Sequence, residues 1–366
     1  MLIASISLIL FLPAALQMVV REGARKLTAR ADATPLLVGA KGSAVDLTLG
    51  ALYFREPTLE PMTYLEVTKM TEHDLASVIP LHLRYNVRGR RIVGTTLDYL
   101  DFRALEVESG RRFAILGECV LGAEAARGLA AAVGDHVVSS PAGAFDIAGT
   151  FPLKMAVVGV FAPTGTADDE AVFVDLKTAW VIAGLAHGHE DVADAGVLAV
   201  EGDNVVANAS VLSYTEITPD NIDGFHFHGS PEGFPVDAIL AVPHDRKSSV
   251  MLRGRYEEPG RSVQMVVPRA VVDDLVETMF SVRDAVFAVS IGLGLATIAT
   301  AVLVFALSIR LRRREIETMR KIGISGRRMR AVLATEVLLV VVASVCIAGG
   351  LTAVVGQYGG AVVGLF

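Results

Sequence analysis

The stretch RLRRREIETMRKIGISGRRMR, residues 310–330, lies between two long apolar runs at residues 285–309 and 331–355. Nine residues of this stretch are Lys or Arg, and only Glu315 and Glu317 are acidic. Short loops that are rich in Lys and Arg remain on the cytoplasmic side of a membrane. The sequence therefore predicts two membrane-spanning helices that are joined by a cytoplasmic loop.

The centre of this loop has the pattern of a short amphipathic helix. Ile316, Met319 and Ile322 recur at helical spacing, and Gly323 and Gly326 end the pattern. Positive charge alone would orient the chain in a membrane, so the apolar face needs a second explanation. We expect this helix to dock onto another protein.

The composition of the whole chain also indicates a membrane protein. Of its 366 residues 52% are hydrophobic, a larger fraction than is usual in soluble domains. The mean hydropathy of the chain is +0.50. The formal net charge of −7 argues against nucleic-acid binding, because the basic residues gather in one loop. Cys119 and Cys346 lie in different regions, so we expect no disulfide between them, and no CxxC motif is present.

A first membrane-spanning helix is expected at residues 1–20, because residues 2–20 carry no charge. At ~1.5 Å per residue this run is just long enough to cross a ~30 Å apolar core. A cleaved signal peptide, with Pro13, Ala14 and Ala15 near its cleavage site, is the alternative, but a positively charged leading region is missing. This absence also means that the natural start could lie upstream.

Residues 21–267 have a mixed, polar composition and predict one large extracytoplasmic α+β domain, which we call the outer domain. A small β-rich insertion is expected at 117–176, between turn-rich segments. Helices are expected at 118–132, 177–186 and 268–284. Strands are expected at 35–38, 91–95, 135–139, 145–150, 155–161, 171–174, 196–200, 236–242 and 262–267.

Residues 268–284 predict a stalk helix that continues into the second span at 285–309. Pro268 suits a helix start, and no helix breaker separates the two segments. An ordinary amphipathic linker helix is the alternative. Residues 356–366 form a Gly-rich tail that is too short for a further crossing, so the sequence predicts three spans.

Small residues recur every fourth position in the second and third spans. Gly292 and Ala296 belong to one such row, and Gly356 and Gly360 belong to the other. Rows of this kind let membrane helices approach closely, so we expect them to be packing surfaces, although chance is an alternative in an Ala- and Gly-rich chain. Glu336 lies near the cytoplasmic end of the third span, where we expect it to pair or pack.

Two pairs of histidines stand out in the outer domain, His187 with His189 and His226 with His228. Residues i and i+2 of a strand face the same side, so His226 and His228 could offer two imidazoles to one zinc ion. The set could be completed by His187, His189, Asp223 or His244 only if folding brings them together. Surface histidines without a metal are the alternative. Apart from this possible zinc, the sequence predicts no cofactor.

Residues 313–324 together with Glu336 resemble the coupling region of FtsX-like ABC permeases of the MacB/LolC type. That region has a basic cluster, a Glu-Ile, a Met or Leu with Arg or Lys, an Ile-Gly, and a Glu early in the next span. The segments LLVGAKG (36–42), LGE (116–118) and GDHV (134–137) resemble the family's periplasmic core domain. The resemblance covers nearly the whole chain.

The resemblance implies a non-catalytic permease subunit, homodimeric and in contact with membrane lipid, that pairs with a separate ABC ATPase. It also implies a multi-pass protein of the bacterial cytoplasmic (inner) membrane whose outer domain moves when the ATPase closes. By position, the ATPase-coupling residues would be Glu315, Ile316, Met319, Arg320, Ile322 and Gly323. A cargo-binding protein outside the membrane is a possible further partner.

Two features bear on this implication. The chain has no GxxxxGK[ST] loop, and GAKGS at 39–43 has the wrong spacing to hold phosphates. The family usually has four spans, whereas three are predicted here. The alternatives to a permease are a membrane-anchored sensor, which should carry a larger cytoplasmic domain, and a zinc-binding scaffold.

Overall fold

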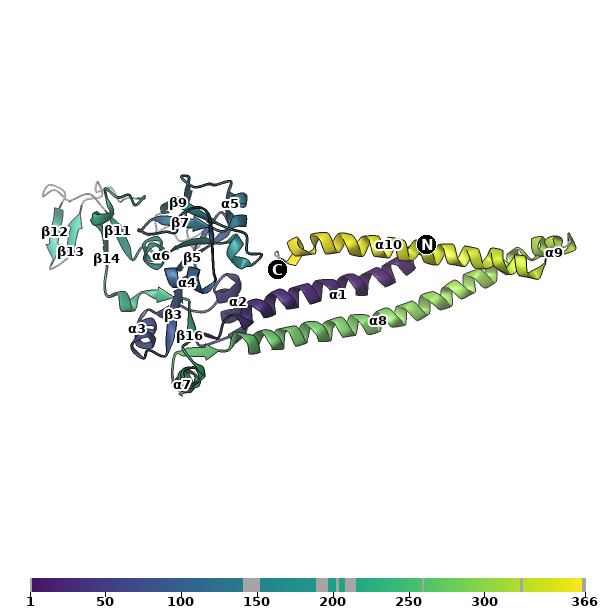
Figure 1. The fold of residues 1–366 in the computed structure, drawn as a ribbon, viewed down its shortest axis with the longest axis horizontal. Coiled ribbons are helices and arrows are strands. Elements are labelled where there is room, and N and C mark those ends of the chain that lie inside the picture. Colours follow the sequence, from purple (N-terminus) through teal and green to yellow (C-terminus); the bar gives the residue numbers. More distant parts are fainter. Residues whose placement is uncertain are drawn as a thin grey trace. The chain divides into compact units, whose positions relative to one another are not determined.

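The structure is a computed structural model that describes residues 2–140, 152–188, 197–201, 204–207, 215–258, 260–322 and 325–363. The chain divides into two compact units. One, the helical unit, comprises Met1–Ala29 and Asp273–Phe366, and the other, the sheet unit, comprises Arg30–Val272. Figure 1 shows the elements of both units.

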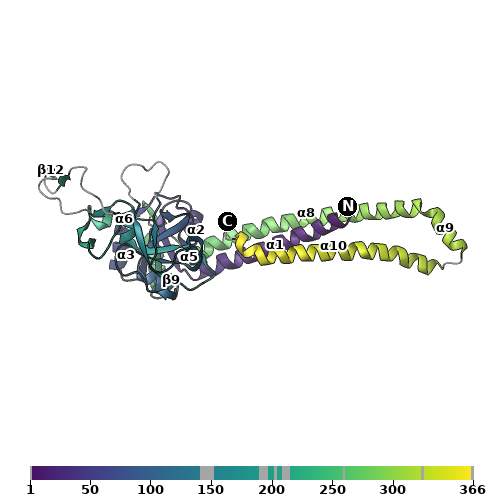
Figure 2. The same cartoon turned by 90° about the horizontal axis from the view of Figure 1, so that it is seen from above.

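The helical unit is built from α1 (Leu2–Asp32), α8 (Pro268–Leu311), α9 (Arg313–Lys321) and α10 (Gly326–Val363). Among the described residues, three helices are long and apolar enough to cross a membrane, namely Ile3–Asp32, Pro268–Leu311 and Ala334–Gly356. This confirms the three expected apolar helices. Figure 2 shows α9 at the turn between α8 and α10.

Two of these helices extend past the expected spans. α1 continues beyond residue 20 to Asp32, because the polar segment that follows contains good helix formers and no proline. α8 is one helix of 44 residues that includes both the expected stalk and the second span. Its unbroken course follows from the absence of any proline after Pro268.

The first sheet of the sheet unit has the strand order β17-β1-β16-β3 and is antiparallel throughout. β1 (Leu36–Ala40) follows α1, and β17 (Val263–Val266) precedes α8. These two strands pair directly, with Val38 opposite Met265. The other two strands are β16 (Ala238–Pro243) and β3 (Ala76–Leu81). The segments by which the chain enters and leaves the sheet unit are therefore neighbours in one sheet.

The second sheet has the strand order β4-β5-β10-β7-β9-β6, and β8 pairs with β9 outside this path. It is mixed, because β5 with β10 and β7 with β9 are parallel pairs. Leu37 of the first sheet and Phe173 of the second share one buried apolar cluster. The strands are β4 (Asn86–Val87), β5 (Arg90–Thr95), β6 (Val107–Gly110), β7 (Glu118–Leu121), β8 (His136–Val138), β9 (Lys154–Phe161) and β10 (Val172–Asp175).

The remaining elements cover or extend these sheets. The helices are α2 (Ala44–Tyr53), α3 (Leu65–Glu72), α4 (Leu97–Phe102), α5 (Ala123–Leu129), α6 (Leu176–Ile182), α7 (Arg246–Tyr256) and the 3-10 turns η1 (Ala167–Glu170), η3 (Ile222–Gly224) and η4 (Pro231–Gly233). Three two-stranded ribbons comprise β2 (Met62–Thr63) with β15 (Pro235–Val236), β11 (Ala186–Gly188) with β14 (Phe225–Phe227), and β12 (Val197–Glu201) with β13 (Asn204–Ala207).

The prediction of a helix at 118–132 is wrong for the first residues of that segment. The structure has strand β7 there, then Gly122, and only then the short helix α5. A Cβ atom at Gly122 would collide with the carbonyl oxygens of Asp168 and Asp169, so a glycine is needed at this close approach. Burial of Cys119, Val120 and Leu121 in the middle of a sheet overrides the helix propensity of the flanking residues.

The expected β-rich segment at 117–176 is also only part of a larger structure. Its strands share the second sheet with β4, β5 and β6, which come from residues 86–110. The strand expected at 145–150 lies outside the described residues. Hydrogen bonding to strands from earlier in the chain cannot be predicted from the composition of one segment.

Candidate functional site

Helix α9 lies in the loop between the two long helices α8 and α10. Helical hydrogen bonding reaches past its last residue, since the amide of Ile322 donates to the carbonyl oxygen of Thr318 over 3.1 Å. Ile316 is half-buried, whereas the side chain of Ile322 is 75% exposed. A large exposed apolar side chain therefore follows directly on a strongly charged helix.

The other predicted coupling residues cannot be placed in equal detail. Glu315, Met319 and Arg320 belong to α9, but their side chains are not among those described, and Gly323 lies outside the described residues. The role of this set in coupling therefore stays a prediction. The neighbouring pair Arg313 and Glu317 lies one helical turn apart at 3.5 Å.

Glu336 pairs with the residue that lies between α8 and α9. Its Oε1 atom accepts a hydrogen bond of 3.1 Å from Nη1 of Arg312. Both side chains are exposed, so the pair contributes little to stability in water, at most about 1 kcal/mol. Its effect is geometric, because it ties the two helices together beside α9.

The row of small residues on α10 faces α1 within the helical unit. Ser7 donates from its Oγ to the carbonyl oxygen of Ser344 over 3.2 Å, and Ser344 donates to the carbonyl oxygen of Ile3 over 3.3 Å. Ser344 is fully buried. A Cβ atom at Gly356 would approach the sulfur of Met18 to 3.1 Å, and Gly360 lies further along the same helix.

The row on α8 has a different environment. A Cβ atom at Gly292 would meet no other atom within 4 Å, and Ala296 is exposed. In the described part of a single chain this row therefore has no packing partner.

We expect the change Ser344→Leu to loosen α1 from α10, because a larger side chain must fit a fully buried site and the hydrogen bond from Oγ of Ser344 to the carbonyl oxygen of Ile3 is lost. Overpacking of this kind costs about 1–3 kcal/mol. Thermal unfolding of the protein in detergent would measure the loss as a lower melting temperature. The matched control is Cys346→Leu, which adds a similar side chain at an exposed position of the same helix. Equal melting temperatures for the two variants would contradict the packing role.

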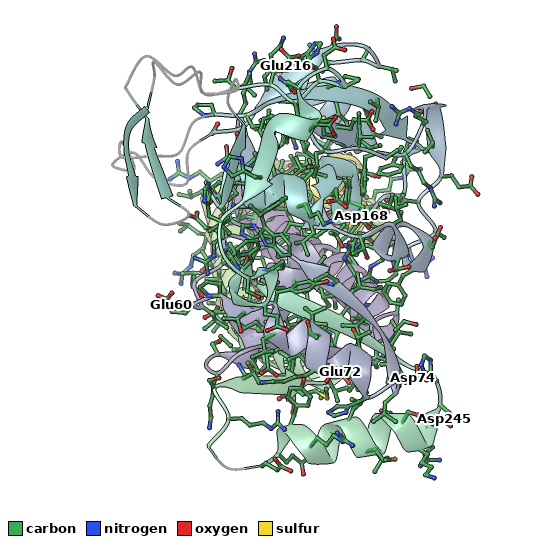
Figure 3. All side chains as sticks on the ribbon, turned by 90° about the vertical axis from the view of Figure 1, so that its left-hand side faces the viewer. Glu60, Glu72, Asp74, Asp168, Glu216 and Asp245 are labelled. Carbon is green, nitrogen blue, oxygen red and sulfur yellow. The ribbon has the colours of Figure 1, made fainter. Side chains whose placement is uncertain are left out.

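A buried ion pair inside the sheet unit links the last turn of α1 to η1, the 3-10 turn that precedes β10 of the second sheet. Arg30 is 6% exposed and Asp168, on η1, is 3% exposed. Nη1 and Nη2 of Arg30 contact the two carboxylate oxygens of Asp168 at 2.5 Å and 3.0 Å, a bidentate arrangement. Figure 3 labels Asp168 among the side chains of the structure.

The remaining polar atoms of this pair are also bonded. The hydroxyl of Tyr99 donates to Asp168 over 2.7 Å and accepts from Arg30 over 2.9 Å, and Nε of Arg30 donates to the carbonyl oxygen of Leu52. Burial alone would raise the pKa of Asp168, but the charge of Arg30 and these hydrogen bonds hold it below its usual value. Burial raises the pKa of Tyr99. The cluster is a fully bonded anchor, which we call the Arg30–Asp168 anchor.

No sequence pattern indicates this anchor. Arg30 and Asp168 are 138 residues apart, and each lies in a charged segment that is typical of a protein surface. Asp168 belongs to a run of three acidic residues with Asp169 and Glu170, so its sequence context does not single it out.

Three of the four predicted histidines lie in or beside the ribbon of β11 and β14. His187 lies opposite His226 in the antiparallel register, and the ring centroids of His226 and His228 are 4.8 Å apart. His189 lies outside the described residues, and the side chain of His187 is not described. Among the side chains that are described, no three of His, Cys, Asp or Glu are grouped closely enough to hold a metal ion.

Comparisons with known proteins agree with this architecture. The family described as MacB-like periplasmic core domain matches residues 3–210, more than half of the chain, and the family described as FtsX-like permease C-terminal matches residues 287–359. A comparison with curated proteins gave no match.

Two solved structures are similar to parts of this chain. The periplasmic region of MacB from Actinobacillus actinomycetemcomitans has 11% sequence identity and a TM-score of 0.39, and the match covers 68% of this chain and 97% of that one. The extracellular domain of the noncanonic ABC-type transporter YknZ from Gram-positive bacteria has 10% identity and a TM-score of 0.34, with 63% and 98% covered.

The family matches confirm the resemblance that was expected from residues 313–324 and Glu336. They account for both units of the chain, since one match reaches from α1 through much of the sheet unit and the other covers most of α8, α9 and α10. The chain therefore belongs to the family of ABC-transporter permeases that join a MacB-like periplasmic core domain to an FtsX-like transmembrane region.

Proposed function

We propose that this permease couples ATP hydrolysis by a separate ABC ATPase subunit to movement of its periplasmic domain. The observation that carries the proposal is α9, a charged helix that is followed directly by the exposed Ile322 and lies between two helices that are apolar enough to span a membrane. ATP hydrolysis is assigned to the partner. The cargo would be a lipoprotein, lipid, peptide, drug, haem or metal-related compound that is exported or extracted from the membrane.

The proposed assembly is a homodimer in the bacterial inner membrane, crossing the bilayer several times in each copy. The small residues at Gly292 and Ala296 support it, because their face of α8 has no partner in the described part of one chain and would let two helices approach closely. The numerous exposed apolar side chains of α8 and α10 would otherwise contact lipid. A cargo-binding protein outside the membrane is a further proposed partner.

The docking function of α9 can be tested by co-purification. A tagged full-length chain is isolated from its native cells, and ATPase activity and the ATPase polypeptide are measured in the eluate. The double change Ile316→Asp with Ile322→Asp is expected to reduce the recovered ATPase at least about tenfold, because charged groups replace an apolar contact surface and a lost interface hot spot costs about 2 kcal/mol or more.

The matched control is Ser325→Asp, which adds one negative charge at an exposed residue beside α9. It should leave recovery of the ATPase within about twofold of the unchanged protein, as expected for a charge at an interface rim. Undiminished recovery with the double variant would refute docking through α9.

A further inference from the structure

We propose that His82 is a proton-sensitive group at the junction of the two sheets, and that its protonation in mild acid opens this junction. The residue belongs to the sheet unit, far in sequence from α9, and nothing in the coupling function requires it. The proposal therefore does not rest on the proposed function, and either could fail without the other.

The backbone at His82 passes from the first sheet to the second. β3 pairs with β16 as far as Leu81, which lies opposite Ala238. The next residue, His82, forms an isolated antiparallel bridge with Gly94 of β5, a strand of the second sheet. The amide of each of these two residues donates to the carbonyl oxygen of the other over 2.9 Å. His82 and Gly94 therefore join the two sheets by a pair of backbone hydrogen bonds.

The imidazole at this junction is buried without a hydrogen-bond partner. His82 is 1% exposed, and neither Nδ1 nor Nε2 has a donor or acceptor among the described residues. Its ring stacks on that of Tyr85, with the ring centroids 5.5 Å apart and the planes inclined by 6°. Buried polar side chains nearly always have a partner, so an imidazole without one needs an explanation. A neutral ring tolerates such a site, whereas a charged ring would lose its hydration at a much larger cost.

The charged groups near His82 offer a protonated ring little compensation. In the described part of the chain they are Asp237, which favours the charged ring, and Arg84, which opposes it. Nε of Arg84 donates to Oδ1 of Asp237 over 2.8 Å, and Oδ2 accepts from the amide of Leu83 over 2.7 Å. The carboxylate is thus already bonded to a cation and to the backbone. Burial outweighs both charges and lowers the pKa of His82.

The packing at Gly94 closes the junction from the side of β5 and α6. A Cβ atom at Gly94 would collide with the side chain of Ala179 on α6 and would lie 3.4 Å from Cβ of His82. Neither Gly94 nor Ala179 has a charge or a side-chain polar atom that could compensate a protonated imidazole. A charged ring regains water only when the strands separate locally, so protonation favours the open junction.

The direction of the pH dependence follows from the lowered pKa of His82. In the opened chain the imidazole takes up a proton near its ordinary pKa of about 6.5, whereas in the closed junction it stays neutral to lower pH. The closed state is therefore fully stable above about pH 6.5 and loses stability as the pH falls toward the folded pKa. Between pH 7.5 and pH 5.0 the equilibrium constant for opening should rise by up to about 30-fold through this one residue.

Opening can be measured by amide hydrogen exchange of the full-length protein in detergent at pH 7.5 and pH 5.0, corrected for the intrinsic exchange rate at each pH. Peptides that contain the bridge between His82 and Gly94 should lose protection by about 10- to 30-fold at pH 5.0. In His82→Phe this loss should fall to about twofold or less, because phenylalanine keeps a ring stacked on Tyr85 and takes up no proton. His82→Leu should behave in the same way and serves as a second variant without an ionisable ring.

The matched control is His244→Gln, which removes an exposed histidine of the same unit that lies near Asp74. It should lose protection at pH 5.0 as the unchanged protein does. Unfolding by denaturant at pH 7.5 would show that the variants are folded, and His82→Phe should be no less stable than the unchanged protein, since neither ring nitrogen has a partner to lose. Equal loss of protection in His82→Phe and the unchanged protein would overturn the proposal. Undiminished protection of the unchanged protein at pH 5.0 would overturn it without reference to any variant.

Discussion

Replacing Asp168 by asparagine is expected to lower the free energy of unfolding of the sheet unit by about 3–5 kcal/mol, because it leaves the charge of Arg30 buried without a counter-ion. The change keeps the shape of the side chain, so the loss reports on charge. Arg30 cannot lose its proton to escape the penalty.

Unfolding can be followed without a label. The chain has one tryptophan, Trp180, which is buried in the sheet unit and packs against Phe234. Its fluorescence in the full-length protein in detergent, as denaturant is added, reports on this unit alone. The matched control is Glu170→Gln, which removes an exposed partner of Arg90 and should cost less than about 1 kcal/mol.

Removing both charges distinguishes an unpaired charge from a lost contact. The double variant Arg30→Met with Asp168→Leu should recover much of the stability lost in Asp168→Asn, because replacing a whole buried pair by apolar groups is often neutral. A double variant that is less stable than Asp168→Asn would show that the hydrogen bonds of Tyr99 and Leu52 matter more than the charges.

The anchor also predicts a dependence on pH. The pKa of Asp168 is lowered in the folded protein, so the unfolded state binds the proton more readily. The stabilisation is then fully present above the unfolded pKa of about 3.9 and is lost as the pH falls through the folded value. The stability difference between the unchanged protein and Asp168→Asn should be constant near neutral pH and shrink only in strong acid.

The sequence predicts the helical unit better than the sheet unit for a physical reason. A lipid environment demands long runs of apolar residues, and a run of this kind is a local property that a sequence displays directly. The basic loop and the helix α9 were visible for the same reason. In the sheet unit, by contrast, β7 became a strand because its neighbours in space bury it, and those neighbours come from distant segments.

In the candidate sites, too, local sequence patterns were predictable, whereas contacts between distant segments were not. The i and i+2 spacing of His226 and His228 is local and was evident, but only the pairing of β11 with β14 places His187 opposite them. The row of small residues on α10 was evident, but its contact with Ser7 depends on how two helices pack. The Arg30–Asp168 anchor depends entirely on the tertiary fold, so no local sequence pattern predicts it.

Replacing Ser281 by proline is expected to uncouple the sheet unit from the proposed ATPase. Ser281 is an exposed residue of α8, ahead of the expected span at 285–309, and the helix is unbroken around it. Proline removes a helical hydrogen bond, clashes with the carbonyl group one turn earlier and costs about 3 kcal/mol in a helix interior. A helix transmits movement along its axis only if it is stiff, so a kink in α8 should prevent movement from reaching the sheet unit. Docking of α9 onto the ATPase should be unaffected.

Movement can be measured between two copies in the proposed dimer by the distance between spin labels. The label is placed at Val250→Cys, which is 63% exposed on α7, in a chain that also carries Cys346→Ser. Burial raises the pKa of Cys119 to about 12, so this native thiol stays protonated and unreactive near neutral pH. Distances are compared with and without nucleotide in the complex with the ATPase.

In the otherwise unchanged protein, nucleotide should shift the distance between the labels, and in Ser281→Pro most of that shift should be lost while the ATPase remains bound. The matched control is Ser281→Ala, which changes the same exposed side chain but strengthens the helix and should keep the full shift. A shift of equal size in Ser281→Pro and Ser281→Ala would mean that stiffness of α8 is not what carries the movement. Loss of the ATPase in Ser281→Pro would place the defect in assembly instead, and it would equally contradict a stalk that acts only in transmission.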